Sequence, residues 1–185
     1  MDTIAVLSAI WFFLPAGLAN MAPVFAAKIP GLRSLNLPLD FGFTIKGKRI
    51  LGDHKTVRGL LSGIVVGILT VYLQTKLYTD YQSVRDMVSI DYVKINSVLL
   101  GVLLGGGAII GDSVKSFFKR QWNIASGEAW LFFDQIDYIL GGIAFTIFYY
   151  PLSWPQYLCI IIIFIALHIA VTHVGYWLGL KPKPY

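Results

Sequence analysis

The stretch INSVLLGVLLGGGAIIGDSVKSFFKR, residues 95–120, decides the fold of this chain. Its first part is long and apolar enough to cross a membrane, because a span needs about 20 mainly apolar residues. It then places Asp112, Lys115, Ser116 and Lys119 on one helical face. Charged groups at membrane depth cost free energy, and they usually mark a functional site. The stretch therefore predicts a transmembrane helix with a polar site near one end.

The composition of the whole chain is that of a membrane protein. Of its 185 residues, 56% are hydrophobic and only 14% are charged, and the mean hydropathy is +0.68. These values exclude an ordinary soluble domain. The single cysteine, Cys159, lies in an apolar run, so the chain has no disulfide framework of its own.

The hydropathy pattern predicts an all-α polytopic membrane protein that forms a single domain over residues 1–185. Two connections differ in kind, because the link near 151–156 is short and uncharged whereas 28–56 is long and basic. Loops of that length usually have a task, and we expect this one to cover or line the inner mouth of the bundle. We predict five transmembrane helices, at about 3–27, 57–78, 95–116, 129–150 and 156–179.

The distribution of lysine and arginine predicts the orientation of these spans. Twelve of the fifteen basic residues fall in the stretch 28–58, in the connection after residue 114 and in the tail. Because basic residues favour the cytoplasmic side, we expect the N-terminus outside and the C-terminus in the cytoplasm. The chain is then an integral protein of the cell membrane with its site facing the cytoplasm. The net charge of +5 is explained by topology, so no nucleic-acid partner is predicted.

Three aspartates are expected to converge on one pocket. Asp112 lies eight residues before Arg120, and Asp134 lies six residues after Glu128, so both sit roughly 10 Å inside the same boundary. Asp137 shares a helical face with Asp134. Three close carboxylates repel one another unless cations neutralise them. Mg²⁺ is the natural candidate, because it prefers oxygen ligands and often bridges carboxylates to substrate phosphates.

Basic residues around these aspartates predict phosphate binding. The segment KGKRILGDHKTVRG, residues 46–59, leads into the second span, and a helix N-terminus with Thr and Lys is suited to phosphate. Carboxylates, Mg²⁺ and cations together are what phosphoryl or nucleotidyl transfer requires. The simpler interpretation of the cations is that they set topology, and a single Asp could form an interhelical ion pair. The candidate phosphate or nucleotide ligands are Lys46, Arg49, Lys55, Thr56, Arg58, Gly59, Lys115, Lys119, Arg120 and, from the first span, Asn20.

Two motifs resemble the CTP:phosphatidate cytidylyltransferases, membrane enzymes that make CDP-activated lipids. GDSVKSFFKR (111–120) followed by DQID (134–137) is similar to their signature, and KTVRG (55–59) is similar to a second motif. The bacterial and eukaryotic members carry Lys-Asp where this chain has Ala125-Ser126. The Asp-Gln-x-Asp form and NMAP (20–23) resemble the archaeal branch, the CDP-archaeol synthases.

The resemblance implies a Mg²⁺-dependent transfer of the cytidylyl group of CTP to an unsaturated archaeal diether glycerol phosphate, with release of diphosphate. It implies that Asp112, Asp134 and Asp137 hold the metal. It also implies that Lys55, Arg58, Lys119 and Arg120 hold phosphates, with Ser116 in support. The isoprenoid ether lipid phosphate would reach the pocket sideways from the membrane, between spans.

Several alternatives remain open from the sequence alone. A bacterial-type CDP-diacylglycerol synthase, a CTP-dependent polyprenol kinase and a cation transporter or channel would each place carboxylates in membrane helices. The glycine-rich run 105–107 allows close helix packing within one subunit or between the subunits of a homodimer. We interpret His168 and His173 as packing or interface residues, because their spacing does not suit one helical face.

Overall fold

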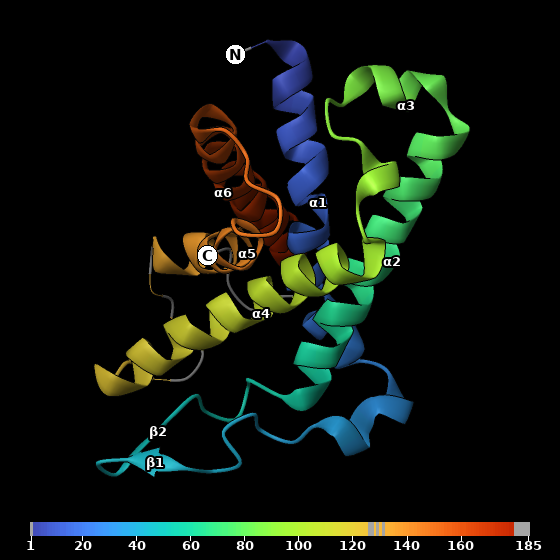
Figure 1. Cartoon of the computed structure of the whole chain (residues 1–185). Coiled ribbons are helices and arrows are strands. Elements are labelled where there is room, and N and C mark those ends of the chain that lie inside the picture. Colours follow the sequence, from blue (N-terminus) through green and yellow to red (C-terminus); the bar gives the residue numbers. More distant parts are fainter. Residues whose placement is uncertain (1, 126–127, 129, 131, 180–185) are drawn as a thin grey trace.

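The computed structural model describes residues 2–125, 128, 130 and 132–179, and Figure 1 shows their arrangement. Long helices α1, α2, α4 and α6 form the frame, and shorter elements connect them. The helices are α1 (Thr3–Ala26), α2 (Val57–Asp80), α3 (Gln82–Met87), α4 (Ser97–Gln121), α5 (Phe133–Thr146) and α6 (Trp154–Trp177), with 3₁₀ turns η1 (Pro30–Leu35) and η2 (Tyr92–Lys94). A two-stranded hairpin pairs β1 (Thr44–Ile45) with β2 (Lys48–Arg49), in the register Thr44↔Arg49.

Local sequence explains where the long helices begin. Asp2, Thr56 and Asn96 each cap a helix, because a side-chain oxygen accepts a hydrogen bond from a backbone amide of the first turn. Ser153 and Gln156 form a capping box at the start of α6. These caps satisfy amide groups that would otherwise lack partners at helix ends.

Within the described residues, four helices are long and apolar enough to cross a membrane, namely α1, α2, α4 and α6. The fourth predicted span, 129–150, is shorter than expected, because α5 covers only Phe133–Thr146. Its length of about 21 Å is less than the roughly 30 Å of a bilayer core. Phe132 has a left-handed φ of 75°, which prevents an earlier start of the helix. Pro151 lies soon after its end, and proline disfavours helix in the preceding residue.

Helix α4 lies at the centre of the bundle and packs against α2 and α5 with little space between the backbones. A Cβ atom on Gly67 or Gly105 would overlap backbone atoms of the facing helix, and the same holds for Gly107 and Gly141 on the α5 side. Small residues let membrane helices approach closely. The helices α2, α4 and α5 are therefore held at fixed separations.

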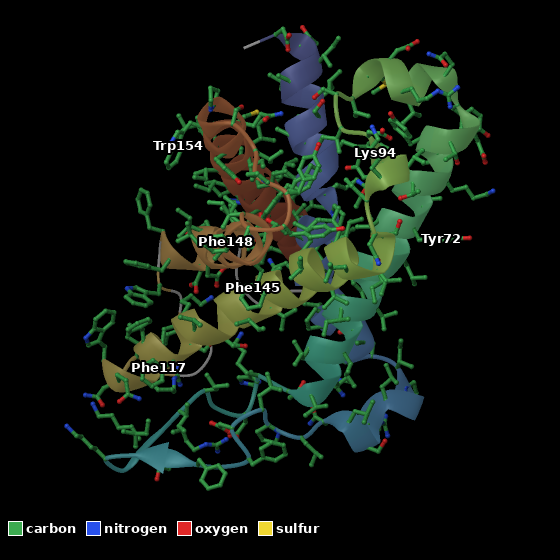
Figure 2. All side chains as sticks on the ribbon, viewed as in Figure 1. Tyr72, Lys94, Phe117, Phe145, Phe148 and Trp154 are labelled. Atoms are coloured by element: carbon green, nitrogen blue, oxygen red, sulfur yellow. The ribbon has the colours of Figure 1, made fainter. Side chains whose placement is uncertain are left out.

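Apolar side chains cover much of the outer surface of the bundle. Phe148 and Trp154, which Figure 2 labels, are 95% and 79% exposed. Exposed apolar side chains of this size suit a lipid environment. The buried core lies between the helices and includes Phe12, Phe13 and Leu104.

The segment 27–56 lies at one end of the bundle, called here the loop end, whereas the N-terminus and α3 lie at the opposite end (Figure 1). Lys48 Nζ donates to the carbonyl oxygen of Gln121 at 2.6 Å, so α4 also finishes at the loop end. The segment returns to α2 through paired backbone bonds between Leu39 and Lys55 and between Leu37 and Val57. It is therefore folded against the bundle.

Candidate active site

Three carboxylates meet around one ammonium group in the interior of the bundle. Lys115 Nζ on α4 lies 3.0 Å from Asp112 Oδ1, 2.7 Å from Asp134 Oδ1 and 2.5 Å from Asp137 Oδ2. The predicted convergence of the three aspartates is therefore confirmed. Their separation is set by the close packing of Gly111 on α4 against the Asp137 backbone and Gly141 on α5.

Two further lysines complete the balance of charge. Lys55 Nζ lies 2.5 Å from Asp112 Oδ2, and Lys119 Nζ lies 3.4 Å from Asp134 Oδ1. The cluster thus consists of three carboxylates and three ammonium groups. Buried charges are tolerated only when they are paired, and each carboxylate of this cluster has at least one ammonium group within ion-pair distance.

The second motif brings Lys55 to the cluster from the loop end. Thr56 Oγ1 accepts a hydrogen bond from the Gly59 amide at 3.1 Å and so fixes the start of α2. A Cβ on Gly59 would contact Pro23 of α1 at 3.5 Å, so α1 and α2 pack closely here. Lys55, Thr56, Arg58 and Gly59 all line the same cavity. Their role as phosphate ligands stays a prediction.

Asp40 orders the segment that leads to Lys55. Its carboxylate accepts hydrogen bonds from the backbone amides of Gly42, Leu51 and Gly52 and pairs with Arg49 at 2.7 Å. Burial of this carboxylate favours its neutral form, but the bonds from Arg49 and from the amides outweigh it and hold the pKa of Asp40 well below its usual range. The loop is thus built around one ionised carboxylate.

The cluster opens into a cavity of about 750 Å³. Helices α1, α2, α4, α5 and α6 and the segment 36–56 all contribute to its wall. Among the predicted site residues, its lining includes Asn20, Lys55, Thr56, Arg58, Gly59, Asp112, Lys115, Asp134 and Asp137. The volume is in the range of small-molecule sites.

Five predicted site residues lie outside the lining of this cavity. Ser116 is buried and donates to the carbonyl oxygen of Asp112. Lys119 is also buried, and it donates to the carbonyl oxygen of Glu128 beside Asp134. Lys46 is exposed on the hairpin, and Arg49 binds Asp40 and Asp53 instead of facing the cavity. Arg120 lies under Gly52 of the loop. Charge alone could not distinguish these partners.

Other residues line the cavity although the sequence reasoning assigned them no site role. His168, Thr172 and His173 reach it from α6, so the interpretation of the two histidines as packing or interface residues is incomplete. Gln135 lies between the two aspartates of α5 and has a buried Oε1 without a hydrogen-bond partner in the described structure. Its position inside the DQID motif was the one signal that could have identified it.

The donor chemistry of the cluster fits a hard cation, although an ammonium group takes its centre in this structure. Three carboxylate oxygens, one from each aspartate, surround a single point. Such oxygens are the ligands that Mg²⁺ prefers. Within the described residues, no three Asp, Glu, His or Cys side chains have the arrangement of a preformed metal site. The metal role of the three aspartates stays a prediction.

An apolar groove between α1 and α6 adjoins the polar cavity. Its volume is about 290 Å³, and Leu14, Phe25, Phe164 and Val171 are among its wall residues. The groove and the cavity share Asn20, Val24, His168 and Thr172. A ligand with a charged head and an apolar chain could therefore occupy both spaces at once.

Known proteins match this arrangement along most of the chain. The family model described as CarS-like, CDP-archaeol synthase, matches residues 1–185. The chain belongs to this family. It is a family of cytidylyltransferases.

Individual relatives in the CDP-archaeol synthase family are similar over nearly their whole length. Proteins of that name from Methanospirillum hungatei JF-1 and Methanosarcina barkeri are 34% and 36% identical, with 93% of this chain and 99% of each relative covered. The relative from Methanocaldococcus jannaschii is 32% identical, with 94% of each chain covered. A solved structure described as an intramembrane enzyme for archaeal membrane lipids biosynthesis has a TM-score of 0.70 at 30% identity, covering 90% of this chain and 93% of that one.

Proposed function

We propose that this chain transfers the cytidylyl group of CTP to an unsaturated archaeal diether glycerol phosphate, 2,3-bis-O-geranylgeranyl-glycerol 1-phosphate, and forms CDP-archaeol and diphosphate. Membership of the CDP-archaeol synthase family supports this reaction. The observation that carries it is the junction of the charged cavity with the apolar groove at Asn20, Val24, His168 and Thr172. The lipid phosphate belongs in the cavity and an isoprenoid chain in the groove.

The cations of the cavity wall bind the phosphates in this proposal. Lys55 comes just before the N-cap of α2 and Arg58 lies in its first turn, whose free amides favour anions. The Nε atom of Arg58 is buried without a hydrogen-bond partner in the described structure, so this guanidinium has donor capacity left for a ligand. Lys115 is the third cation that substrates can reach, because it too lines the cavity.

Asp112, Asp134 and Asp137 are the residues that would hold Mg²⁺. When bound, the ion would polarise phosphate oxygens and neutralise charge on the leaving diphosphate. An oxygen of the lipid phosphate then forms a bond to the α-phosphorus of CTP, and the bond from that phosphorus to the diphosphate breaks. The role of Lys55, Arg58 and Lys115 is to align the reacting groups and to absorb their charge, so no covalent protein nucleophile is needed.

Ser116, Lys119 and Arg120 support the site from outside the cavity in this proposal. Lys119 joins Asp134 to the backbone of the α4–α5 connection, so it positions the carboxylate. Arg49 acts through Asp40 on the loop that presents Lys55. These are positioning roles, and they replace the direct substrate contacts that the sequence suggested.

We also propose that α5 belongs to a fifth membrane crossing. Helix α4 finishes at the loop end, because Lys48 binds Gln121 there. The last turns of α6 line the cavity with Thr172 and His173, so α6 also runs toward that end. The connection between α4 and α6 must then return across the bundle, and α5 is the helix that the structure describes within it. Because basic residues gather at the loop end, we propose that this end faces the cytoplasm of the cell.

A transfer assay tests the reaction. Purified protein is incubated with the diether lipid phosphate, Mg²⁺ and CTP labelled on either the α- or the γ-phosphorus. We expect only the α-label to enter the organic phase, and chelation by EDTA to prevent it. Transfer of the γ-label would instead show a lipid kinase, and transfer of neither label by folded protein would favour an ion-transport role.

Two matched controls sharpen this assay. Asp112→Asn removes one charge at constant size and should abolish transfer, whereas Asp86→Asn alters an exposed aspartate on α3 and should leave it unchanged. An ester-linked phosphatidate offered in competition separates the archaeal reaction from a bacterial-type CDP-diacylglycerol synthase.

Crosslinking in nanodiscs that hold one or two copies would decide whether a homodimer forms.

A further inference from the structure

The hairpin of residues 41–49 exposes large apolar side chains at the loop end of the bundle. Phe41 and Phe43 are each 68% exposed, and Ile45 is 42% exposed. A connection that faces only water is normally polar at its tip. A cluster of exposed apolar groups beside charged ones indicates a surface that binds something.

The exposed side chains stand on a rigid base. The amide of Phe43 donates to the carbonyl oxygen of Asp40 at 2.8 Å, and the amide of Ile50 donates to the carbonyl oxygen of Phe43 at 3.2 Å. Phe41 has a φ of 46°, which is an unfavourable conformation for a bulky residue. The Phe41 ring is thus held outward at a cost in conformational free energy.

Charge defines the kind of surface that fits the hairpin. Residues 28–49 contain five cations and one carboxylate, and that carboxylate, Asp40, is already paired with Arg49. The unpaired excess is positive. Basic residues interleaved with aromatic and aliphatic ones suit the interface of an anionic bilayer, where rings enter the headgroup region and cations meet lipid phosphates.

The position of the hairpin agrees with this partner. Lys48 fastens the hairpin to Gln121, the last residue of α4. Phe118 and Trp122, at the same end of α4, are 44% and 61% exposed. Aromatic side chains at the ends of spans mark the level of the membrane interface. The hairpin therefore shares that level, and Figure 1 shows it extending beyond the loop end of α2 toward that of α4.

We propose that the hairpin of residues 41–49 docks into the interfacial layer of the bilayer leaflet at the loop end, with Phe43 and Ile45 in the headgroup region and Lys46 and Lys28 on anionic lipid phosphates. The base of this hairpin is Asp40, which also orders Leu51 and Gly52 on the way to Lys55. The membrane surface thereby steadies the segment that lines part of the polar cavity.

Depth measurement by nitroxide labels tests the proposal independently of any catalytic activity. Replacing the single cysteine, Cys159→Ala, gives a background for Phe43→Cys and Ile45→Cys, each labelled in nanodiscs of phosphatidylcholine and phosphatidylglycerol. His54→Cys is the matched control on the same loop, because His54 is exposed and lines the aqueous cavity. We expect oxygen to relax the labels at 43 and 45 several-fold more than a water-soluble nickel chelate does, with the reverse at 54.

Other outcomes overturn the proposal. Labels at 43 and 45 that match the label at 54 would place the hairpin in water. Dipolar broadening between copies, lost on dilution with unlabelled protein, would show that a second copy covers it. Two independent label sites guard against one variant that fails to fold.

The attraction of Lys46 and Lys28 to anionic lipid can be tested separately. Lys46 has a left-handed φ of 51°, which asparagine tolerates, so Lys46→Asn removes the charge without changing the turn. Combined with Lys28→Gln, it should move the label at 43 toward water. The same shift is expected for the unaltered hairpin in nanodiscs of phosphatidylcholine alone. A depth that is unchanged in both cases would contradict attraction to anionic lipid.

Discussion

Lys115 Nζ on α4 lies 2.5 Å from Asp137 Oδ2 on α5. Both side chains are largely buried, at 12% and 5% exposure. The same ammonium group also reaches Asp112 and Asp134. Among the described residues, Lys115 is therefore the one lysine that contacts all three aspartates, and its removal would leave their carboxylates facing each other in the bundle.

The variant Lys115→Met should lower the free energy of unfolding by about 3–5 kcal/mol, because it leaves buried charges without their partner. Denaturation in detergent micelles measures this change. Lys76→Met is the control, since Lys76 is 61% exposed in its pair with Asp80 and such pairs contribute about 0–1 kcal/mol. Similar losses for both variants would contradict the central role of Lys115.

Removal of divalent metal should separate activity from stability. In the natural protein, EDTA is expected to stop cytidylyl transfer without changing the midpoint of thermal unfolding, because the three lysines still neutralise the three aspartates. In Lys115→Met, added Mg²⁺ should raise that midpoint. If EDTA destabilised the natural protein instead, the metal would have a structural role.

Neighbouring glycines on α4 should differ sharply in their tolerance to alanine. A Cβ on Gly105 would overlap the backbone of Gly63, whereas a Cβ on Gly106 would make an ordinary contact with Ile64 at 3.5 Å. We expect Gly105→Ala to destabilise the protein by about 1–3 kcal/mol and Gly106→Ala to have little effect. Thermal unfolding of both variants in the same detergent provides the comparison.

Two arginines of the basic segment should give different kinetic effects. Arg58 lines the cavity, so Arg58→Gln should raise the KM for CTP or lipid phosphate roughly 10–100-fold, as expected for loss of a charged hydrogen bond worth about 1.5–3 kcal/mol. Arg49→Gln should instead lower kcat, because Arg49 binds Asp40. Equal effects on KM would mean that Arg49 also meets substrate.

The loop end should be insensitive to pH over the neutral and mildly acidic range. Asp40 has a lowered pKa in the folded protein, so its contribution to stability is present above its unfolded value of about 3.9 and is lost only as the pH falls through the lower folded value. At neutral pH, Asp40→Asn should speed tryptic cleavage after Lys46 and Lys48. Asp53→Asn, at a side chain that is 77% exposed, should not.

Much of the reaction centre could be predicted from spacing. Asp134 and Asp137 share a helical face, and Asp112 lies at a similar depth on the neighbouring antiparallel helix. Helical spacing and depth were therefore enough to predict that the three aspartates meet. The role of Lys115 as their common partner was not predictable, because it depends on how closely α4 and α5 approach. That approach is set by Gly111 and Gly141, whose contacts are not visible in hydropathy.

Other features of the site were not predicted, because a sequence pattern does not show which residue a side chain contacts. Arg49 was predicted to bind phosphate, but in the structure it pairs with Asp40, a buried carboxylate nine residues earlier in the chain. Thr172 and His173 sit in a helix with an almost uniformly apolar character, so no periodicity pointed them at the cavity. The shortness of α5 depends on the left-handed backbone of Phe132, a conformation that its identity does not reveal.

The glycine contacts on two sides of α4 also affect how substrate preference can change during evolution. At Gly105 and Gly141 the helix backbones are already in contact, so no side chain there can be made smaller or larger. The spacing of the helices around the charged end of the pocket is therefore fixed. The wall between α1 and α6 is built differently, since Phe164 and Leu14 can be exchanged for larger or smaller residues. Selection for longer, shorter or more branched lipid chains can therefore act on the groove between α1 and α6. Changes there leave the charged site that binds the lipid phosphate undisturbed.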